Sequence, residues 1–294
     1  MSSWSHQTGT WQQPLPWASV STKRTETLNL TEQGLAKACC ADLYQSDLAR
    51  LVFGDTLHPG GLALTNQLAR FMYLQPDDWV FDLASGRGSS ALAVSRVFHC
   101  NVVGVEFGAA AVAQSRASSL EAPPAPRAMF LRGDAEWPPL RPGCLDAVFC
   151  ECSMSLFMDK AAAVRGIARL LRPGGKFGLS DVTVVAGSLP PELGGTVGQL
   201  LCLSDALDTQ GYLSLLESAG LQVVHQQDAS GEILKILDGV ESKLGALQAW
   251  QGLVQQAGDE SDILEKVPQL IVKLRQMVDS GRLGYWLFVA EKPS

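Results

Sequence analysis

Short apolar runs alternate with helical segments from about residue 79 to the end of the chain. Seven runs have the apolar content and length of buried strands: 79–84, 101–107, 128–135, 145–154, 176–185, 221–228 and 285–292. Four segments between them have apolar residues at helical spacing: 89–98, 109–120, 160–171 and 208–219. Strands separated by helices predict a parallel sheet covered on both faces. The expected fold class is α/β, a doubly wound (Rossmann-like), seven-stranded, mostly parallel sheet.

Three regions fall outside this alternation. Residues 230–280 place apolar side chains at the helical period, which predicts a helical insertion before the last strand. Residues 1–28 are rich in Ser, Thr, Gln, Pro and Trp and show no period, which predicts a mobile N-terminal tail. Residues 29–76 predict a helical lid of two helices, the second over Leu62–Met72, separated by the LHPGG break. The remaining residues, 77–294, form the expected main domain.

Composition and charge narrow the class of protein. The chain has 294 residues, of which 46% are hydrophobic and 18% charged, so it is an ordinary globular protein rather than a disordered or fibrous one. The formal net charge of −7 argues against a nucleic-acid partner. The N-terminus lacks a basic region followed by an apolar one, and no apolar run reaches the ~18 residues of a membrane span. Seven cysteines, an odd number, in a chain of this size indicate a reducing, cytoplasmic location.

A glycine-containing turn lies where the first strand becomes a helix. The segment DLASGRGSSA, from Asp82 to Ala91, allows a ligand to approach the backbone closely, and the following helix N-terminus offers unpaired amides. Glu106 ends the second strand about twenty residues later, where a carboxylate can accept both hydroxyls of a ribose. Asp134 ends the third. The turn lacks the third glycine of a dinucleotide fingerprint, so the pattern favours another nucleotide-like cofactor.

The motifs DLASGRG, GVEF, GDAE, LDAVFCECSMSLF and LLRPGGKFGLSDV, in this order, resemble the signature of class I S-adenosylmethionine-dependent methyltransferases. The resemblance implies that the glycine loop contacts the amino-acid part of the cofactor, that the acid after the second strand binds the ribose, and that the acid after the third contacts the adenine. The implied cofactor-binding residues are Asp82, Ala84, Ser85, Gly86, Gly88, Glu106, Phe107, Asp134, Ala135 and Glu151. Ala84 departs from the family, which usually has glycine there.

A narrower resemblance concerns two cysteines. The stretches CSMSLFMDKAAAVRGIARLLRPGGKFGLSDV and CLSDALDTQGYLSLLESAGL are similar to arsenite methyltransferases, which carry cysteines at the positions of Cys152 and Cys202. In that family thiolates hold trivalent arsenic while it receives the methyl group, and soft thiolates select soft centres. The family also has a cysteine near the glycine loop, which this chain lacks. The adjacent pair Cys39 and Cys40, on the first lid helix, is the candidate source of further thiols. The candidate catalytic residues are therefore Cys39, Cys40, Cys152 and Cys202.

Packing is the alternative interpretation of the thiols, because free cysteine behaves as a small buried hydrophobe. Cys100 and Cys144 are expected to be packing residues. Strand alternation predicts that Cys150 and Cys152 point to one face of the sheet and Glu151 to the other. A structural zinc site is not expected, because the cysteine spacing does not match zinc motifs. Among the histidines, His58 is the one placed to act as a general base, with a structural loop histidine as the alternative.

The sequence thus predicts a methyltransferase that uses S-adenosylmethionine and acts on a small molecule, with trivalent arsenic as a candidate acceptor. Catalysis would come chiefly from holding the two reactants together. One alternative is methylation of an oxygen, nitrogen or carbon of a small metabolite, as in quinone or sterol methyltransferases, with the cysteines as packing residues. Another is a cofactor-binding protein without transfer activity. The sequence does not set the oligomeric state.

Overall fold

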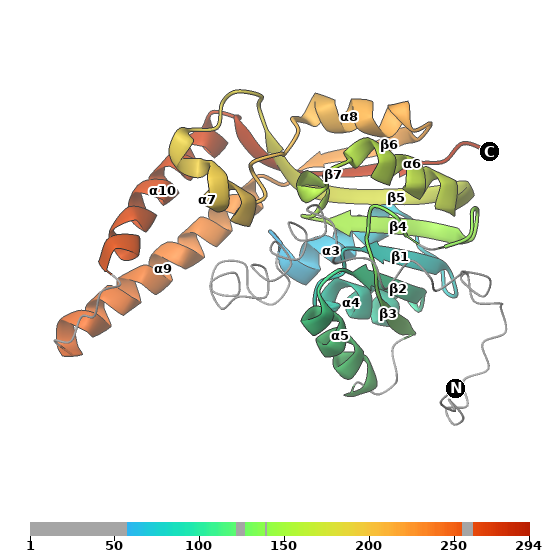
Figure 1. Ribbon diagram of the computed structural model, residues 1–294, viewed down its shortest axis with the longest axis horizontal. Coiled ribbons are helices and arrows are strands. Elements are labelled where there is room, and N and C mark those ends of the chain that lie inside the picture. The colour runs from blue at the N-terminus through green and yellow to red at the C-terminus, as the bar shows by residue number, and fades with distance from the viewer. Residues whose placement is uncertain (1–57, 122–126, 139, 255–260) are drawn as a thin grey trace.

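The strands of this computed structural model form one sheet, and the structure describes residues 58–121, 127–138, 140–254 and 261–294. The sheet has seven strands in the order β3-β2-β1-β4-β5-β7-β6 (Figure 1). The bounds are β1 Trp79–Leu83, β2 Asn101–Glu106, β3 Ala128–Arg132, β4 Leu145–Glu151, β5 Leu171–Val184, β6 Gln222–Asp228 and β7 Leu283–Glu291. The first five strands are parallel to one another, whereas β7 runs antiparallel to β5 and β6. The expected doubly wound, mostly parallel sheet is confirmed.

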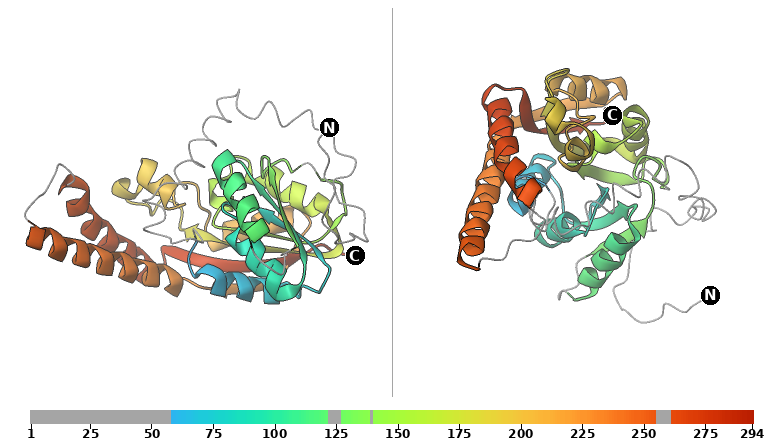
Figure 2. Two further views of the ribbon diagram at one scale, coloured as in Figure 1. Left: turned by 90° about the horizontal axis from the view of Figure 1, so that it is seen from below. Right: turned by 60° about the vertical axis from the view of Figure 1, so that its left-hand side comes forward.

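Helices cover both faces of the sheet (Figure 2). Their bounds are α3 Gly61–Phe71, α4 Ser89–Phe98, α5 Ala109–Glu121, α6 Lys160–Leu170, α7 Gly195–Leu200, α8 Thr209–Ser218, α9 Gly231–Val254 and α10 Ser261–Asp279. Buried residues of α3, α4, α9 and α10 pack on one face, and those of α6 and α8 pack on the other. Every residue of β1 and β2 is buried. Because both faces of these strands are buried, their sequences are nearly continuous apolar runs.

Helix α3, expected as the second lid helix, packs into the core. Its Leu68 and Met72, at the helix end, are 1% and 2% exposed. Both lie against β5 at Gly178, where an added Cβ would come within 2.6 Å of the sulfur of Met72. The close packing shows that α3 is one of the helical layers of the domain. The expected tail and first lid helix, with Cys39 and Cys40, lie outside the described residues.

The region expected as a helical insertion contains α9 and α10, which extend together away from the sheet (Figures 1 and 2). Leu237 of α9 and Ile271 and Leu274 of α10 belong to the core on their face of the sheet. Arg275 joins the two helices, because its guanidinium lies 2.6 Å from carboxylate oxygens of both Asp238 and Glu241. In the described parts of the chain, no helix is long and apolar enough to cross a membrane.

The glycine-rich stretch ELGGTVGQL before Cys202 is partly helical. It contains a 3₁₀ turn over Pro191–Leu193 and the short helix α7. Leu193 is fully buried, and an added Cβ on Gly198 would lie 2.4 Å from its carbonyl oxygen. Glycine here therefore permits close packing of two helical turns, a role that the sequence does not distinguish from loop flexibility.

Candidate active site

The glycine loop follows β1 at the carboxyl edge of the sheet, next to the point where the strand order reverses between β1 and β4. Ligands of open α/β sheets bind at such a point. Ala84, Gly86 and Gly88 all have positive φ, of 58°, 51° and 80°. Ala84 thus adopts the left-handed conformation that favours glycine, which is the residue that class I methyltransferases usually have at this position. The alanine side chain makes this conformation cost roughly 1 kcal/mol.

Glu106 joins the loop to β2. Its carboxylate accepts the amide hydrogen of Gly86 at 3.0 Å and that of Gly108 at 2.7 Å. The residue is 8% exposed, and burial raises the pKa of its carboxyl group while the two amides oppose the rise. Glu106 therefore sets the relative position of the turns after β1 and β2, in addition to the ribose-binding role implied by the resemblance.

The turn after β3 is ordered by two acids. Asp134 accepts the amide hydrogen of Glu136 at 3.0 Å, next to the buried Ala135. Glu136, 4% exposed, accepts amide hydrogens of Met158 and Asp159, each at 3.1 Å. Sequence reasoning did not single out Glu136, because its partners lie more than twenty residues away at the start of α6. Phe107 is half-buried beside Glu106.

Three carboxylates converge below the loop. Glu106 and Glu151 end β2 and β4, and Asp82 is the last residue but one of β1, the strand between them. The three residues are 8%, 9% and 3% exposed. Burial raises the pKa of Asp82 well above its ordinary value, and the charges of Glu151 and Glu106 raise it further. Buried carboxylates repel one another, so a bound cation stabilises such a group. The site is therefore electrostatically suited to a positively charged ligand.

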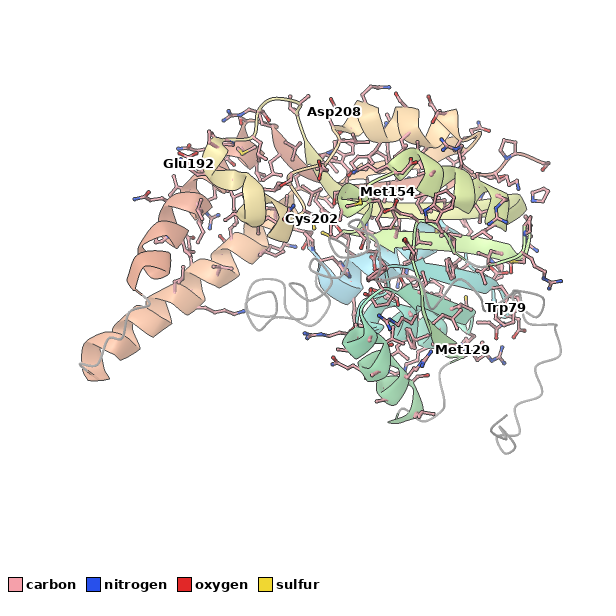
Figure 3. All side chains as sticks on the ribbon, viewed as in Figure 1. Trp79, Met129, Met154, Glu192, Cys202 and Asp208 are labelled. Carbon is pink, nitrogen blue, oxygen red and sulfur yellow. The ribbon has the colours of Figure 1, made fainter. Side chains whose placement is uncertain are left out.

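Two of the candidate thiols meet in the fold. Cys152 follows β4 directly, Cys202 follows α7, and their sulfur atoms are 3.4 Å apart. Cys202 also donates to the carbonyl oxygen of Cys152 at 3.5 Å. The hydrogen bond to Cys202 and burial raise the pKa of the Cys152 thiol well above its ordinary value. Figure 3 places Cys202 and Met154 toward the carboxyl edge of the sheet, whereas Trp79, the first residue of β1, lies at the opposite edge.

The expectation that Cys150 and Cys152 share a face was wrong. Cys150 packs with the core on the face of α6, and Cys152 packs with the core on the face of α3. Strand alternation ends at Glu151, because Cys152 has a φ of 50° and the chain turns there. Cys202 also has a positive φ, of 61°. Two non-glycine residues thus hold strained backbone where their thiols meet, and such strain is typical of functional positions.

The other cysteines differ from this pair. Cys100 is buried with its thiol directed at the carbonyl oxygen of Gln75, and Cys144 is half-buried. Both pack against apolar clusters. None of the described cysteines forms a disulfide.

Comparisons with known proteins agree with this geometry. Residues 81–179 match the family model described as "Methyltransferase domain". The chain is 25% identical to the 27-O-demethylrifamycin SV methyltransferase of Amycolatopsis mediterranei, over 84% of this chain and 94% of that protein. It is 28% identical to the methyltransferase GfsG of Streptomyces halstedii, over 84% and 91%.

A phosphoethanolamine N-methyltransferase of Haemonchus contortus, solved with S-adenosylhomocysteine, has the same fold with a TM-score of 0.70, at 18% identity, over 87% of this chain and 61% of that one. The protein is an S-adenosylmethionine-dependent methyltransferase. The narrower likeness to arsenite methyltransferases stays a prediction.

The residues of this methyltransferase fit its cofactor. Asp82 Oδ2, Ser85 Oγ and Glu151 Oε1 are buried around the glycine loop without a hydrogen-bond partner among the described residues. Buried polar atoms normally have partners, so these three are free to bind a polar ligand. When bound, S-adenosylmethionine supplies an electrophilic methyl group on its sulfonium sulfur. The protein would contribute orientation of the acceptor and exclusion of water.

The methyltransferase also has a buried acid at this edge, Asp181 of β5, which sequence reasoning missed. Its carboxylate accepts the amide hydrogens of Ser155 at 2.9 Å and Val182 at 2.8 Å. Burial raises its pKa from 3.8 to about 6. The two acceptor bonds show that it organises the turn after β4, where Cys152 lies.

Asp181 predicts a pH dependence of stability. The folded enzyme keeps this proton up to about pH 6, whereas the unfolded chain loses it near pH 4, so the free energy of unfolding falls as the pH rises through this window. The contribution is about 3 kcal/mol. Urea unfolding measured from about pH 4 to pH 7 gives the free energy of unfolding at each pH. This free energy is expected to fall less steeply for Asp181→Asn than for the wild type. If the free energy of unfolding falls equally steeply with pH in the two proteins, Asp181 does not cause the fall.

Proposed function

We propose that the methyl acceptor is a soft, thiol-binding centre, with trivalent arsenic as the candidate, and that Cys152 and Cys202 hold it. The observation that carries the proposal is the pair of buried sulfur atoms 3.4 Å apart at the carboxyl edge of β4. A single soft atom bound by both thiolates needs two sulfurs at such a non-bonded distance. Thiolates favour soft centres over the oxygen ligands that other acceptors use.

The protonated state of the thiols is compatible with this chemistry. Arsenous acid exchanges two hydroxide ligands for two thiolates, so that two sulfur–arsenic bonds form, two oxygen–arsenic bonds break, and the thiol protons leave in two water molecules. The raised pKa of Cys152 therefore does not oppose uptake. The lone pair that remains on arsenic is the nucleophile.

Further ligands would come from Cys39 and Cys40, which remain a prediction. The described residues contain no group of three or more His, Cys, Asp and Glu side chains arranged to hold a metal ion. A third thiolate from either of these residues would complete three-coordinate binding of arsenic.

Serine variants test the proposal. Cys152→Ser and Cys202→Ser are expected to lower arsenite affinity and arsenite-dependent release of S-adenosylhomocysteine by roughly tenfold or more, because serine oxygen is a poor ligand for a soft centre. Cys144→Ser is the control, because Cys144 is half-buried away from the pair. Calorimetry with arsenite and a product assay measure the two effects. Equal behaviour of all three variants would contradict the proposal.

A second candidate is methylation of an oxygen atom on an organic metabolite. It is supported by the similarity to the 27-O-demethylrifamycin SV methyltransferase over most of both chains. The same variants separate the candidates. Turnover of a hydroxylated organic acceptor that survives in Cys152→Ser and Cys202→Ser would assign the pair to packing and favour the oxygen acceptor.

A further inference from the structure

The two thiols proposed to hold the acceptor are enclosed in the structure. Cys152 and Cys202 are 5% and 1% exposed. An acceptor that exchanges its ligands for both sulfur atoms has to reach them. Part of the protein around the pair therefore has to move before an acceptor binds.

Residues 185–207, here called the cover segment, bring Cys202 onto Cys152. The segment joins the end of β5 to α8 and contains the 3₁₀ turn over Pro191–Leu193 and helix α7. At its base the amide of Val184 donates to the carbonyl oxygen of Leu207 at 3.0 Å, so its two ends lie together. Hinges of moving segments are a few residues at the ends of elements. The cover segment can therefore change position while β5 and α8 stay in place.

Hydrogen bonds inside the cover segment join its parts into one unit. The carbonyl oxygen of Gly198 accepts the amide hydrogen of Leu203 at 2.7 Å, and the amide of Cys202 donates to the carbonyl oxygen of Gln199 at 3.1 Å. Gly198 also packs against the 3₁₀ turn, since an added Cβ would lie 2.4 Å from the carbonyl oxygen of Leu193. The 3₁₀ turn, α7 and Cys202 are therefore expected to move together.

An ion pair joins the cover segment to α10. The ammonium nitrogen of Lys273 lies 2.6 Å from Oε1 of Glu192, in the 3₁₀ turn. Figure 3 shows Glu192 on the side of the segment toward α10 and Cys202 on the side toward the sheet. The neighbouring Leu193 is fully buried in the core cluster that includes residues of α10. Apolar burial and the ion pair thus hold the same turn.

The ion pair is the part of this attachment that salt weakens. The side chains of Lys273 and Glu192 are 37% and 54% exposed, so dissolved ions screen their attraction. The hydrogen bond from Lys273 lowers the pKa of the Glu192 carboxyl group, as expected for paired charges. An exposed pair of this kind shifts a local equilibrium by about two- to fivefold. A shift of this size suits a contact that opens and closes reversibly.

We propose that the cover segment is a gate over the Cys152 and Cys202 thiols and that the ion pair between Lys273 and Glu192 is its latch. When the latch opens, the segment carries Cys202 away from Cys152, and a ligand reaches both sulfur atoms. Lys273 and Glu192 are positioning residues that act through the segment. Passage of a methyl acceptor through the gate rests on the proposed function, whereas exposure of the thiols does not.

Thiol alkylation tests the gate without an acceptor. Iodoacetamide is uncharged and reacts with accessible thiolates, so the alkylation rates of Cys152 and Cys202 at fixed alkaline pH report opening. Mass spectrometry of the full chain after digestion measures each rate. Lys273→Met and Glu192→Gln are each expected to raise both rates about two- to fivefold at low salt. Sodium chloride should raise the wild-type rates toward those of the variants and leave the variants unchanged.

A reversed pair and two controls make the test specific. The double variant Lys273→Glu with Glu192→Lys restores opposite charges, so its rates should return toward the wild-type values. Lys235→Met is the control variant, because it breaks an exposed ion pair with Glu232 within α9. Cys100 is the reference thiol, because it is fully buried just before β2, and its rate should not change.

The outcomes separate the gate from the acceptor. Faster alkylation of Cys152 and Cys202, together with faster association of arsenite, would support both proposals. Faster alkylation in a protein that binds no arsenite would support the gate and contradict arsenic as the acceptor. Equal rates in the wild type and both latch variants, no recovery in the reversed pair, or an equal rise at Cys100 would overturn the gate.

Discussion

Replacement of Glu106 by alanine is expected to lower the affinity for S-adenosylmethionine by roughly 100-fold. The carboxylate accepts the amide hydrogens of Gly86 and Gly108, so its removal leaves two donors unsatisfied beside the cofactor loop. Each lost bond to a charged acceptor costs about 1.5–3 kcal/mol. The ribose hydroxyls would lose the same acceptor. Calorimetry of the purified protein measures the loss.

Two comparisons make this prediction specific. Glu217→Ala removes an exposed carboxylate and is expected to leave the affinity unchanged. Glu106→Gln keeps the side-chain shape but loses the charge and presents an amide donor to a backbone donor, so an intermediate loss is expected. An unaltered dissociation constant for S-adenosylmethionine in Glu106→Ala would show that Glu106 does not support cofactor binding. Preferential binding of a nicotinamide dinucleotide would contradict the choice of cofactor.

The second large effect is expected at Gly88, the residue before α4. Its φ is +80°, and an added Cβ would lie 2.5 Å from the ring of Phe130 and 2.9 Å from the side chain of Ser115. Gly88→Ala therefore combines left-handed strain of about 1–2 kcal/mol with overpacking of about 1–3 kcal/mol. Both stability and cofactor affinity should fall, because the same turn forms the cofactor loop. Urea unfolding and calorimetry measure the two effects.

Gly174 provides the matched control. It has a similar φ of +76°, but no described atom lies within 4 Å of an added Cβ. Gly174→Ala is therefore expected to cost only the strain, about 1–2 kcal/mol, and to leave cofactor affinity unchanged. A Phe130→Leu background should reduce the cost of Gly88→Ala toward that of Gly174→Ala. If it does not, the clash with Phe130 is not the cause.

The sequence by itself determined the sheet and its connections. Parallel strands buried on both faces must be apolar throughout, so β1 and β2 were recognisable from composition alone. The glycine loop was recognisable for a related reason, since positive φ and close packing at Gly88 exclude other residues. Glu106 was placed at the ligand edge because it ends a strand. These features depend on local conformation and burial, which the local sequence encodes.

The tertiary structure decided how distant residues meet. Cys152 and Cys202 are 50 residues apart, and only the tertiary fold brings their sulfurs, just past the ends of β4 and α7, to 3.4 Å. The turn at Cys152 also separates it from Cys150, because strand alternation holds only while the backbone stays extended. His58 reaches Glu151 across 93 positions of sequence, since α3 packs into the core. Such contacts follow from the relative placement of whole elements, which no short pattern of residues encodes.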